Sequence, residues 1–242
     1  MKYNWKTNIF STLLFLLFWI IFYIDYIKAG EYNNPDVFTN IFMSSQNKYN
    51  DSSTFVGYIL TIIFLLSLNR CINKPVDSFI IRYGKDRFLK INITYTFIHA
   101  FLFSFEYWIV NFIFICFTFD WQILINSNFF TCSILYFLTR FLYFLTIAIF
   151  AVFIKVLFNY KKIHIIISSL IILAINTLPS LMINKGIILF AGFIDDWMQE
   201  GTFDLIDYVK NALICIIVSA ILATAARLVF LKKDILINEE EN

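Results

Sequence analysis

Residues Ile91–Phe119 read INITYTFIHAFLFSFEYWIVNFIFICFTF, and Glu106 is the one residue of this stretch that is charged at neutral pH. About 20 apolar residues of helix are enough to cross the hydrocarbon core of a bilayer. The stretch exceeds that length, and it lacks the roughly ten-residue segments of alternating hydrophobicity that mark a transmembrane β-strand. It therefore predicts a membrane-crossing α-helix that tilts or continues beyond the bilayer.

The rest of the chain has the same apolar character. Of its 242 residues, 60% are hydrophobic, 20% are aromatic and 15% are charged. Soluble domains are about 45–50% apolar and about 25% charged, so this chain has more apolar surface than one globular core can bury. That excludes a soluble enzyme, a disordered chain and a disulfide scaffold. We expect an all-α integral membrane protein, with residues 1–242 forming a single transmembrane domain.

Six stretches are apolar and long enough to be spans. The second is short and is expected to begin near Ser52. We expect the first to be retained, because Asp25–Lys28 offers no small-residue cleavage site. The six predicted spans are Ile9–Ile27, Thr54–Leu68, Ile91–Phe119, Phe129–Phe158, Ile163–Ile183 and Tyr208–Leu231.

The distribution of lysine and arginine predicts the orientation of these spans. If both termini are cytoplasmic, fourteen of the 19 basic residues lie in inner segments, and acidic residues gather in the outer ones. An excess of Lys and Arg on the cytoplasmic side is the rule for membrane proteins. We therefore predict cytoplasmic N- and C-termini. The net charge of +2 indicates no nucleic-acid partner.

Two outer connections are long enough to have structure of their own. Residues Lys28–Asp51 are polar and could form a small cap. Gly186–Ile194 is apolar but too short to cross the membrane, which predicts a re-entrant segment between spans five and six. Pro179 is expected to kink or end span five before that segment.

The sequence lacks the motifs of most enzymes. It contains no zinc-binding or hydrolase signature and no phosphate-binding P-loop. The four cysteines are far apart, which signals neither a zinc site nor a disulfide framework, and His99 and His164 are interpreted as structural. We therefore expect no catalytic residue, no metal site and no cofactor bound by this chain, and an intramembrane enzyme is disfavoured.

Two charged residues lie deep within predicted spans. Counting from the outer ends of their helices, Glu106 is about 20 Å deep and Arg140 about 16 Å deep. Spans three and four are antiparallel neighbours, so the two residues are expected at similar depth. Charges within a membrane usually face a partner or a cavity. We predict an intramembrane ion pair that joins the helices, or else a polar lining of a translocation path.

Span six carries small residues, which allow helices to approach closely. They indicate either close packing within the bundle or the seam of a dimer. These residues are Ala212, Ser219, Ala220, Ala223, Thr224 and Ala226.

The inner connection Asn69–Lys90 is the most charged part of the chain. Pro75 can begin a short helix there, and Gly84 can end it in a left-handed turn. Between them, four apolar residues are spaced by three and four and so share one helix face. They are Val76, Phe79, Ile80 and Tyr83. This amphipathic helix is interpreted either as a membrane-surface anchor or as a docking element for a cytoplasmic partner.

The string Ile81-Arg82-Tyr83-Gly84-Lys85-Asp86-Arg87 resembles an I-R-Y-G-[SK]-x-[RK] stretch of permeases from bacterial peptide-export and lantibiotic-immunity systems. Six spans with both ends inside are similar to the architecture of an ABC-2-type ABC transporter permease subunit. The resemblance implies that about Pro75–Arg87 is a coupling helix that docks onto the ATPase. The residues it implies for coupling are Pro75, Val76, Phe79, Ile80, Arg82, Tyr83, Gly84 and Arg87.

The resemblance also implies a function. Two permease subunits, identical or homologous, would face each other in a bacterial plasma membrane, above two ABC ATPase subunits that bind ATP and Mg²⁺. The cargo would be a hydrophobic or amphipathic peptide, such as a bacteriocin or a phenol-soluble modulin, which is moved outward. The alternative is a standalone immunity or sensor protein that attracts cationic peptides to the acidic outer segment Asp195–Asp207.

Overall fold

The long apolar runs form long helices in the computed structural model, which describes residues 5–28, 30, 34–43, 48–71, 80, 84–158, 166–171 and 205–232. Residues 166–171 are helical, and no strand occurs within these ranges. The other elements, in chain order, are α1 (Trp5–Lys28), α2 (Pro35–Val37), η2 (Phe38–Met43), η3 (Lys48–Asn50), η4 (Ser52–Leu60), α3 (Thr61–Cys71), α5 (Lys85–Thr118), α6 (Trp121–Asn126), α7 (Phe129–Leu157) and α10 (Leu205–Lys232).

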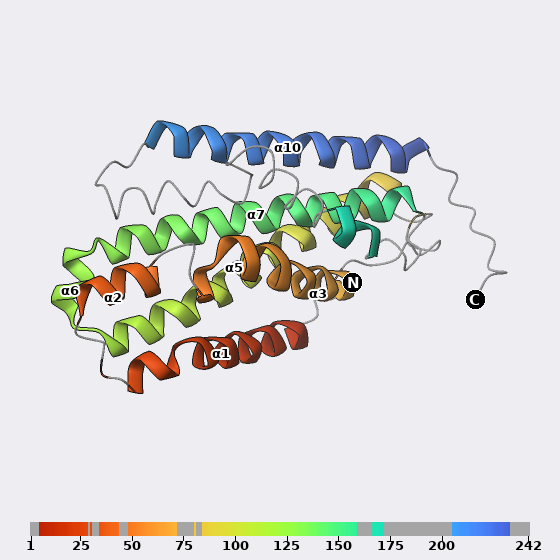
Figure 1. Ribbon diagram of the computed structural model, residues 1–242. Coiled ribbons are helices and arrows are strands. Elements are labelled where there is room, and N and C mark those ends of the chain that lie inside the picture. The colour runs from red at the N-terminus through yellow and green to blue at the C-terminus, as the bar shows by residue number, and fades with distance from the viewer. Residues whose placement is uncertain are drawn as a thin grey trace.

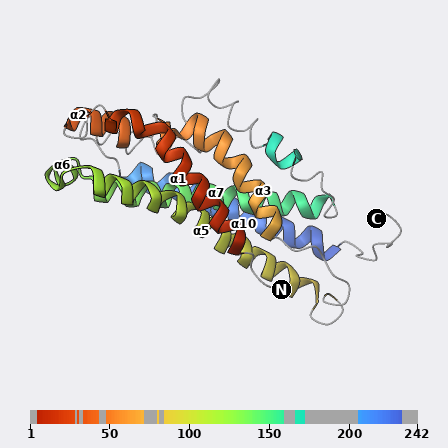
Figure 2. The ribbon, with the colours of Figure 1, turned by 90° about the horizontal axis from the view of Figure 1, so that it is seen from below.

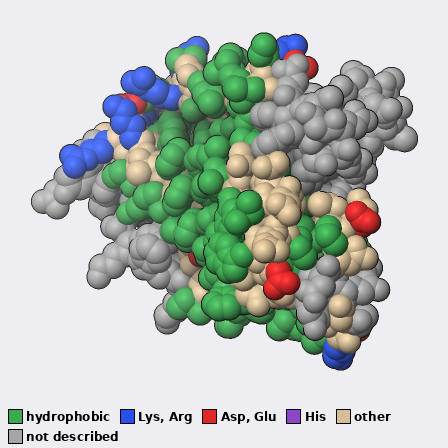
Figure 3. Space-filling model, turned by 90° about the vertical axis from the view of Figure 1, so that its left-hand side faces the viewer, with side chains coloured by type: hydrophobic (Ala, Val, Ile, Leu, Met, Phe, Trp, Pro, Cys, Tyr) green, Lys and Arg blue, Asp and Glu red, His purple; other side chains and the backbone are tan. Residues whose placement is uncertain are grey.

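Four of these helices, α1, α5, α7 and α10, are long and apolar enough to cross a membrane. A shorter apolar helix, Phe55–Cys71, comprises most of η4 and all of α3. Hydrophobic side chains cover most of the described surface seen in Figure 3, and large ones are exposed along α1 and α10. These observations confirm an all-α membrane protein.

The predicted spans agree with the helices wherever the structure describes them. The second span begins at Ser52, as expected, and α5 begins at Lys85 rather than Ile91 because its first, charged turns are also helical. Most of the predicted fifth span, Ile163–Ile183, lies outside the described residues, as do Pro179 and the predicted re-entrant segment Gly186–Ile194.

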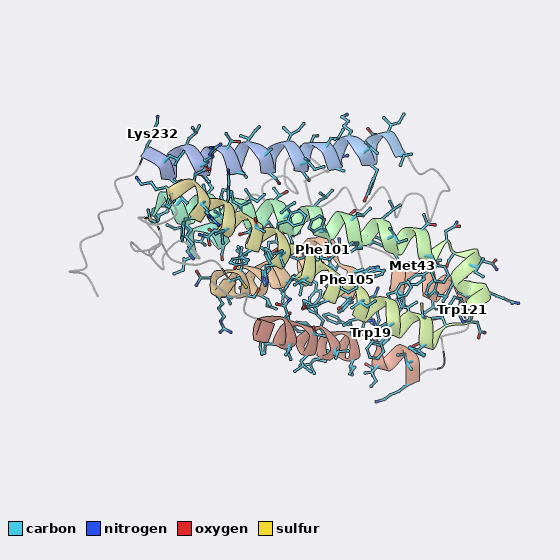
Figure 4. The ribbon with its side chains drawn as sticks, turned by 180° about the vertical axis from the view of Figure 1, so that it is seen from behind. Trp19, Met43, Phe101, Phe105, Trp121 and Lys232 are labelled. Carbon is cyan, nitrogen blue, oxygen red and sulfur yellow. The ribbon has the colours of Figure 1, made fainter. Side chains whose placement is uncertain are left out.

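The direction of each helix follows from its contacts. Helix α1 runs parallel to α5, since Phe15 contacts Phe103 and Trp19 stacks on Phe114. We call the end where α1 and α5 begin and α3, α7 and α10 finish the inner end, and the end with α2 and α6 the outer end (Figures 1 and 2). Lys232 and Trp121 mark the inner and outer ends in Figure 4.

Helices α7 and α10 also run parallel to each other. The hydroxyl oxygens of Thr139 and Tyr208 are 3.1 Å apart, and those of Thr146 and Ser219, further toward the inner end, are also 3.1 Å apart. Among the small residues of α10, Ser219 and Ala226 are buried, whereas Ala220 and Thr224 are exposed. Close packing within the bundle therefore accounts for part of the small-residue pattern.

Aromatic rings fill the centre of the bundle. Phe103 of α5 is fully buried, and its ring lies 5.0 Å from Phe15 of α1, 5.1 Å from Phe64 of α3 and 5.1 Å from Phe144 of α7. Edge-to-face pairs at such distances are favourable. One side chain thus joins four helices.

The outer loop folds into the bundle as a cap, which we define as η2 and η3. Phe38 and Phe42 are buried, and both rings contact Phe119 at the end of α5. Tyr49 stacks on Tyr107 at 4.5 Å, and each hydroxyl donates to the other residue's backbone carbonyl. The prediction that Lys28–Asp51 could form a small cap is confirmed for its described residues.

Candidate functional site

The predicted coupling segment is described only at its C-terminal side. Pro75, Val76, Phe79, Arg82 and Tyr83 lie outside the described residues, while Ile80, Gly84 and Arg87 lie within them. The described part of the coupling segment is therefore the junction between the inner loop and α5.

That junction has a turn at Gly84. The amide of Gly84 donates to the carbonyl of Ile80 at 2.8 Å, and the half-buried Ile80 packs against the core. Gly84 has φ 82° and ψ 154°, a conformation that essentially only glycine adopts. Helix α5 begins at the next residue, and Arg87 is exposed on its first turn.

The first turn of α5 is joined to the end of α10. Asp86 accepts a hydrogen bond from Nε of Arg227 at 2.7 Å, and Lys90 lies 3.0 Å from the same carboxylate. Nearby, the rings of Phe88 and Phe230 stack at 5.7 Å. The helix that continues the inner loop is thus bound to α10 at the inner end.

We expect Asp86→Asn and Arg227→Gln each to lower the melting temperature slightly in detergent, because these side chains are partly exposed and water screens their attraction. The double variant should have a melting temperature no lower than that of the less stable single variant, because the loss of one contact explains both effects. Lys210→Gln on the same helix is the control, because its 3.9 Å pair with Asp207 lies at the outer end. Independent losses that add in the double variant would contradict the contact.

Glu106 is held by α1. Nδ2 of Asn8 donates to its Oε1 at 2.6 Å, and the hydroxyl of Ser11 donates to its Oε2. Asn8 and Ser11 are both buried, and Glu106 is half-buried. Two donors on successive turns of α1 therefore solvate a carboxylate that lies between helices.

Arg140 is held by the cap. Its Nη2 donates to the carbonyl of Asn50 at 2.7 Å, and its guanidinium carbon lies 5.7 Å from the centre of the Tyr136 ring. Asn50 in turn donates through Nδ2 to the carbonyl of Phe42 at 2.6 Å. The guanidinium of Arg140, which is 3% exposed, ties α7 to the cap.

The structure does not bring Glu106 and Arg140 together as the predicted ion pair. Successive residues of a helix point about 100° apart, so Glu106 and Tyr107 point in different directions. Glu106 is bonded to Asn8 of α1, whereas Tyr107 lies between Phe15 of α1 and Tyr49 of the cap, beside the partner of Arg140. The two residues were placed correctly on neighbouring helices, but they face different elements.

Because their partners differ, the effects of Glu106→Gln and Arg140→Gln on the free energy of unfolding should add. We expect a double-mutant cycle to give a coupling energy below about 0.5 kcal/mol. Unfolding of the purified protein in detergent measures it. A double variant as stable as either single variant would instead indicate a shared ion pair.

A pocket lies in the outer half of the bundle, between α5, α7 and the cap. It holds about 400 Å³ of empty space, including its open mouth. Most of its wall is aromatic, and Arg140 is the one charged residue among the described residues that line it. The lining residues are Phe42, Met43, Asn50, Tyr107, Trp108, Asn111, Phe129, Ser133, Tyr136, Phe137 and Arg140.

Sequence reasoning found Arg140 but missed the other polar groups of this pocket. Asn111 and Ser133 are polar residues within apolar spans, and that contrast was the available signal. Each is bonded to an indole: Trp19 donates to Oδ1 of Asn111 at 2.9 Å, and Trp108 donates to Oγ of Ser133 at 2.7 Å. Trp19 and Met43 lie in the outer half of the bundle in Figure 4.

His99 lies in a separate polar cluster between α3 and α5. Its Nε2 is 2.8 Å from the hydroxyl of Ser67, its Nδ1 is 3.6 Å from Sγ of Cys71, and its ring stacks on Phe64. Ser67 donates its hydrogen to the carbonyl of Phe64 at 2.8 Å, which leaves Nε2 of His99 as the donor to Ser67. These contacts support the structural interpretation of His99.

The described residues contain no group of three His, Cys, Asp or Glu side chains that could hold a metal ion. Comparisons of the chain with models of protein families, with curated proteins and with solved structures found no match.

Proposed function

We propose that this chain is the transmembrane permease subunit of an ATP-driven exporter, and that it moves a hydrophobic or amphipathic peptide out of a bacterial cell. The observation that supports this proposal most directly is the continuity of α5. This helix begins at the segment that resembles an ATPase-docking motif, is joined there to α10, and reaches the pocket at Tyr107, Trp108 and Asn111.

The proposal includes six spans with both termini in the cytoplasm. Helices α7 and α10 run parallel, so Phe158 lies at the inner end and Leu205 at the outer end. Parallel neighbouring helices require the chain to return along the bundle between them. Ile163–Ile183 is apolar and long enough to make that crossing, and we assign it as span five.

In this proposal, partner subunits of the assembly in the plasma membrane supply the energy for transport. Two ABC ATPase subunits bind ATP with Mg²⁺ and close beneath two permease subunits, and the segment Pro75–Arg87 transmits that closure to α5. ATP binding then biases the bundle between two states, as a ligand does in any two-state system. The aromatic wall of the pocket suits an apolar or amphipathic cargo.

The test is co-expression of the chain with an ABC ATPase subunit, sought first in the neighbouring reading frames, followed by purification in detergent and measurement of ATP hydrolysis. We expect the two proteins to co-purify and the permease to change the hydrolysis rate. Phe79→Ala with Tyr83→Ala should abolish that change without altering the helical circular dichroism spectrum. The matched control is Leu13→Ala with Leu17→Ala, an exposed pair with the same spacing on α1.

Unchanged coupling in the Phe79→Ala, Tyr83→Ala variant would contradict the docking role. A chain that purifies without any ATPase and binds cationic peptides at Asp195–Asp207 would instead support the immunity or sensor function.

A further inference from the structure

Two polar residues that line the pocket, Asn111 and Ser133, each accept a hydrogen bond from a tryptophan side chain. Nε1 of Trp19 donates to Oδ1 of Asn111 at 2.9 Å. That bond fixes the orientation of the amide, since only the oxygen can accept. Nδ2 of Asn111, with its two hydrogens, is then left to donate, and Asn111 lines the pocket.

Ser133 is oriented in the same way. Its oxygen accepts from Nε1 of Trp108 at 2.7 Å. The hydroxyl hydrogen remains to donate, and Ser133 lines the pocket. Two polar residues from α5 and α7 are thus both set as donors by a neighbouring indole.

Arg140 adds a positive charge to these donors. Its guanidinium carries five N–H groups, and one of its nitrogens reaches the carbonyl of Asn50. Asn111, Ser133 and Arg140 therefore give the pocket donors and a cation, and no anionic residue is present among the described residues of its lining. This is the chemistry that recognises an oxyanion, above all a carboxylate.

The surroundings of the pocket indicate which kind of molecule carries that oxyanion. Eight of the lining residues are buried, and the less buried ones, Trp108, Asn111 and Phe137, mark the open side. The rings of Trp108 and Phe137 are 5.5 Å apart, and both contact the exposed Phe105. The opening thus adjoins an apolar aromatic surface between two membrane-spanning helices.

We propose that this pocket binds the carboxylate of a single-chain anionic amphiphile that enters from the bilayer, such as a fatty acid. The carboxylate accepts from Arg140, Asn111 and Ser133, and the acyl chain leaves past Trp108 and Phe137 toward Phe105. The site is independent of the proposed transport function, because it requires neither an ATPase nor a peptide cargo.

The test uses the full chain in nanodiscs of phosphatidylcholine, at a mildly alkaline pH that ionises the probe. Dibrominated stearate, whose bromines quench nearby indoles, is compared with its methyl ester, which has the same chain and no charge. We expect the acid to quench tryptophan fluorescence at an about tenfold lower concentration than the ester, because each hydrogen bond to a charged group contributes strongly. Unlabelled oleate should reverse the quenching.

Variants separate binding from folding. Asn111→Asp keeps the acceptor for Trp19 but replaces the donors by a negative charge, so it should remove the preference for the acid. Arg140→Gln should remove it as well. Lys155→Gln, which changes another buried cation of α7 outside the pocket, should leave the preference intact.

Equal quenching by acid and ester, or a preference that survives Asn111→Asp, would overturn the proposal. So would competition by an amphipathic peptide with a free C-terminal carboxylate when oleate fails to compete, which would assign the pocket to a peptide. Neither result would depend on ATPase coupling, so the proposed function stands or fails separately.

Discussion

Replacing Phe103 by alanine is expected to lower the free energy of unfolding by about 3–5 kcal/mol. The ring is fully buried and contacts Phe15, Phe64 and Phe144, which lie on three other helices. In a membrane, packing rather than release of water drives helix association, so the cavity left behind removes contacts at the point where four helices meet. Thermal unfolding in detergent measures the loss.

The matched control for this substitution lies on the same helix. Phe117 is 87% exposed, so Phe117→Ala removes an equal number of atoms without opening a cavity. It should change the melting temperature little. Similar losses for Phe103→Ala and Phe117→Ala would mean that the centre of the bundle is not packed as described.

Replacing Glu106 by leucine should have the second-largest effect. It removes the acceptor of the buried Asn8 amide, whereas the hydroxyl of Ser11 can donate instead to the carbonyl of Asn8, 2.8 Å away. An unsatisfied buried donor costs about 1–3 kcal/mol, so we expect a loss in that range, concentrated at the contact between α1 and α5. Limited proteolysis of the N-terminal helix, together with thermal unfolding, measures it.

An apolar replacement of the whole cluster is the decisive control. Asn8→Leu and Ser11→Ala, combined with Glu106→Leu, remove the donors as well as the acceptor. Exchanging both partners for apolar groups is close to neutral, so this triple variant should recover most of the lost stability. A triple variant as unstable as Glu106→Leu alone would show that Glu106 has a partner other than α1.

The helices could be predicted from the sequence because the thickness of the bilayer core sets how many apolar residues a membrane-crossing helix needs. The sequence placed α7 within one residue of its observed ends, Phe129–Leu157. The apolar span predicted to begin at Ile91 is preceded by six residues of the same helix, Lys85–Lys90. Hydropathy reports where a helix enters lipid, and the charged first turns of α5 are helical without being apolar.

The sequence alone could not show that Glu106 and Arg140 do not pair with each other. Depth can be counted from residue number, but the rotation of each helix is set by side chains such as Phe103 and Tyr107 that pack against particular neighbours. The pocket was missed for a related reason. Asn111 and Ser133 acquire their chemistry from Trp19 and Trp108, and the pairing of Trp19 with Asn111 joins positions far apart in the chain.

The length of α5 has a mechanical consequence. The helix contains neither glycine nor proline between Lys85 and Thr118, so it has no built-in hinge. Asn111 lies about 39 Å along the axis from Lys85 at a rise of 1.5 Å per residue. A tilt of only about 5° about the Gly84 turn would therefore move Asn111 by about 3 Å. That displacement is about as long as the hydrogen bond between Asn111 and the Trp19 indole.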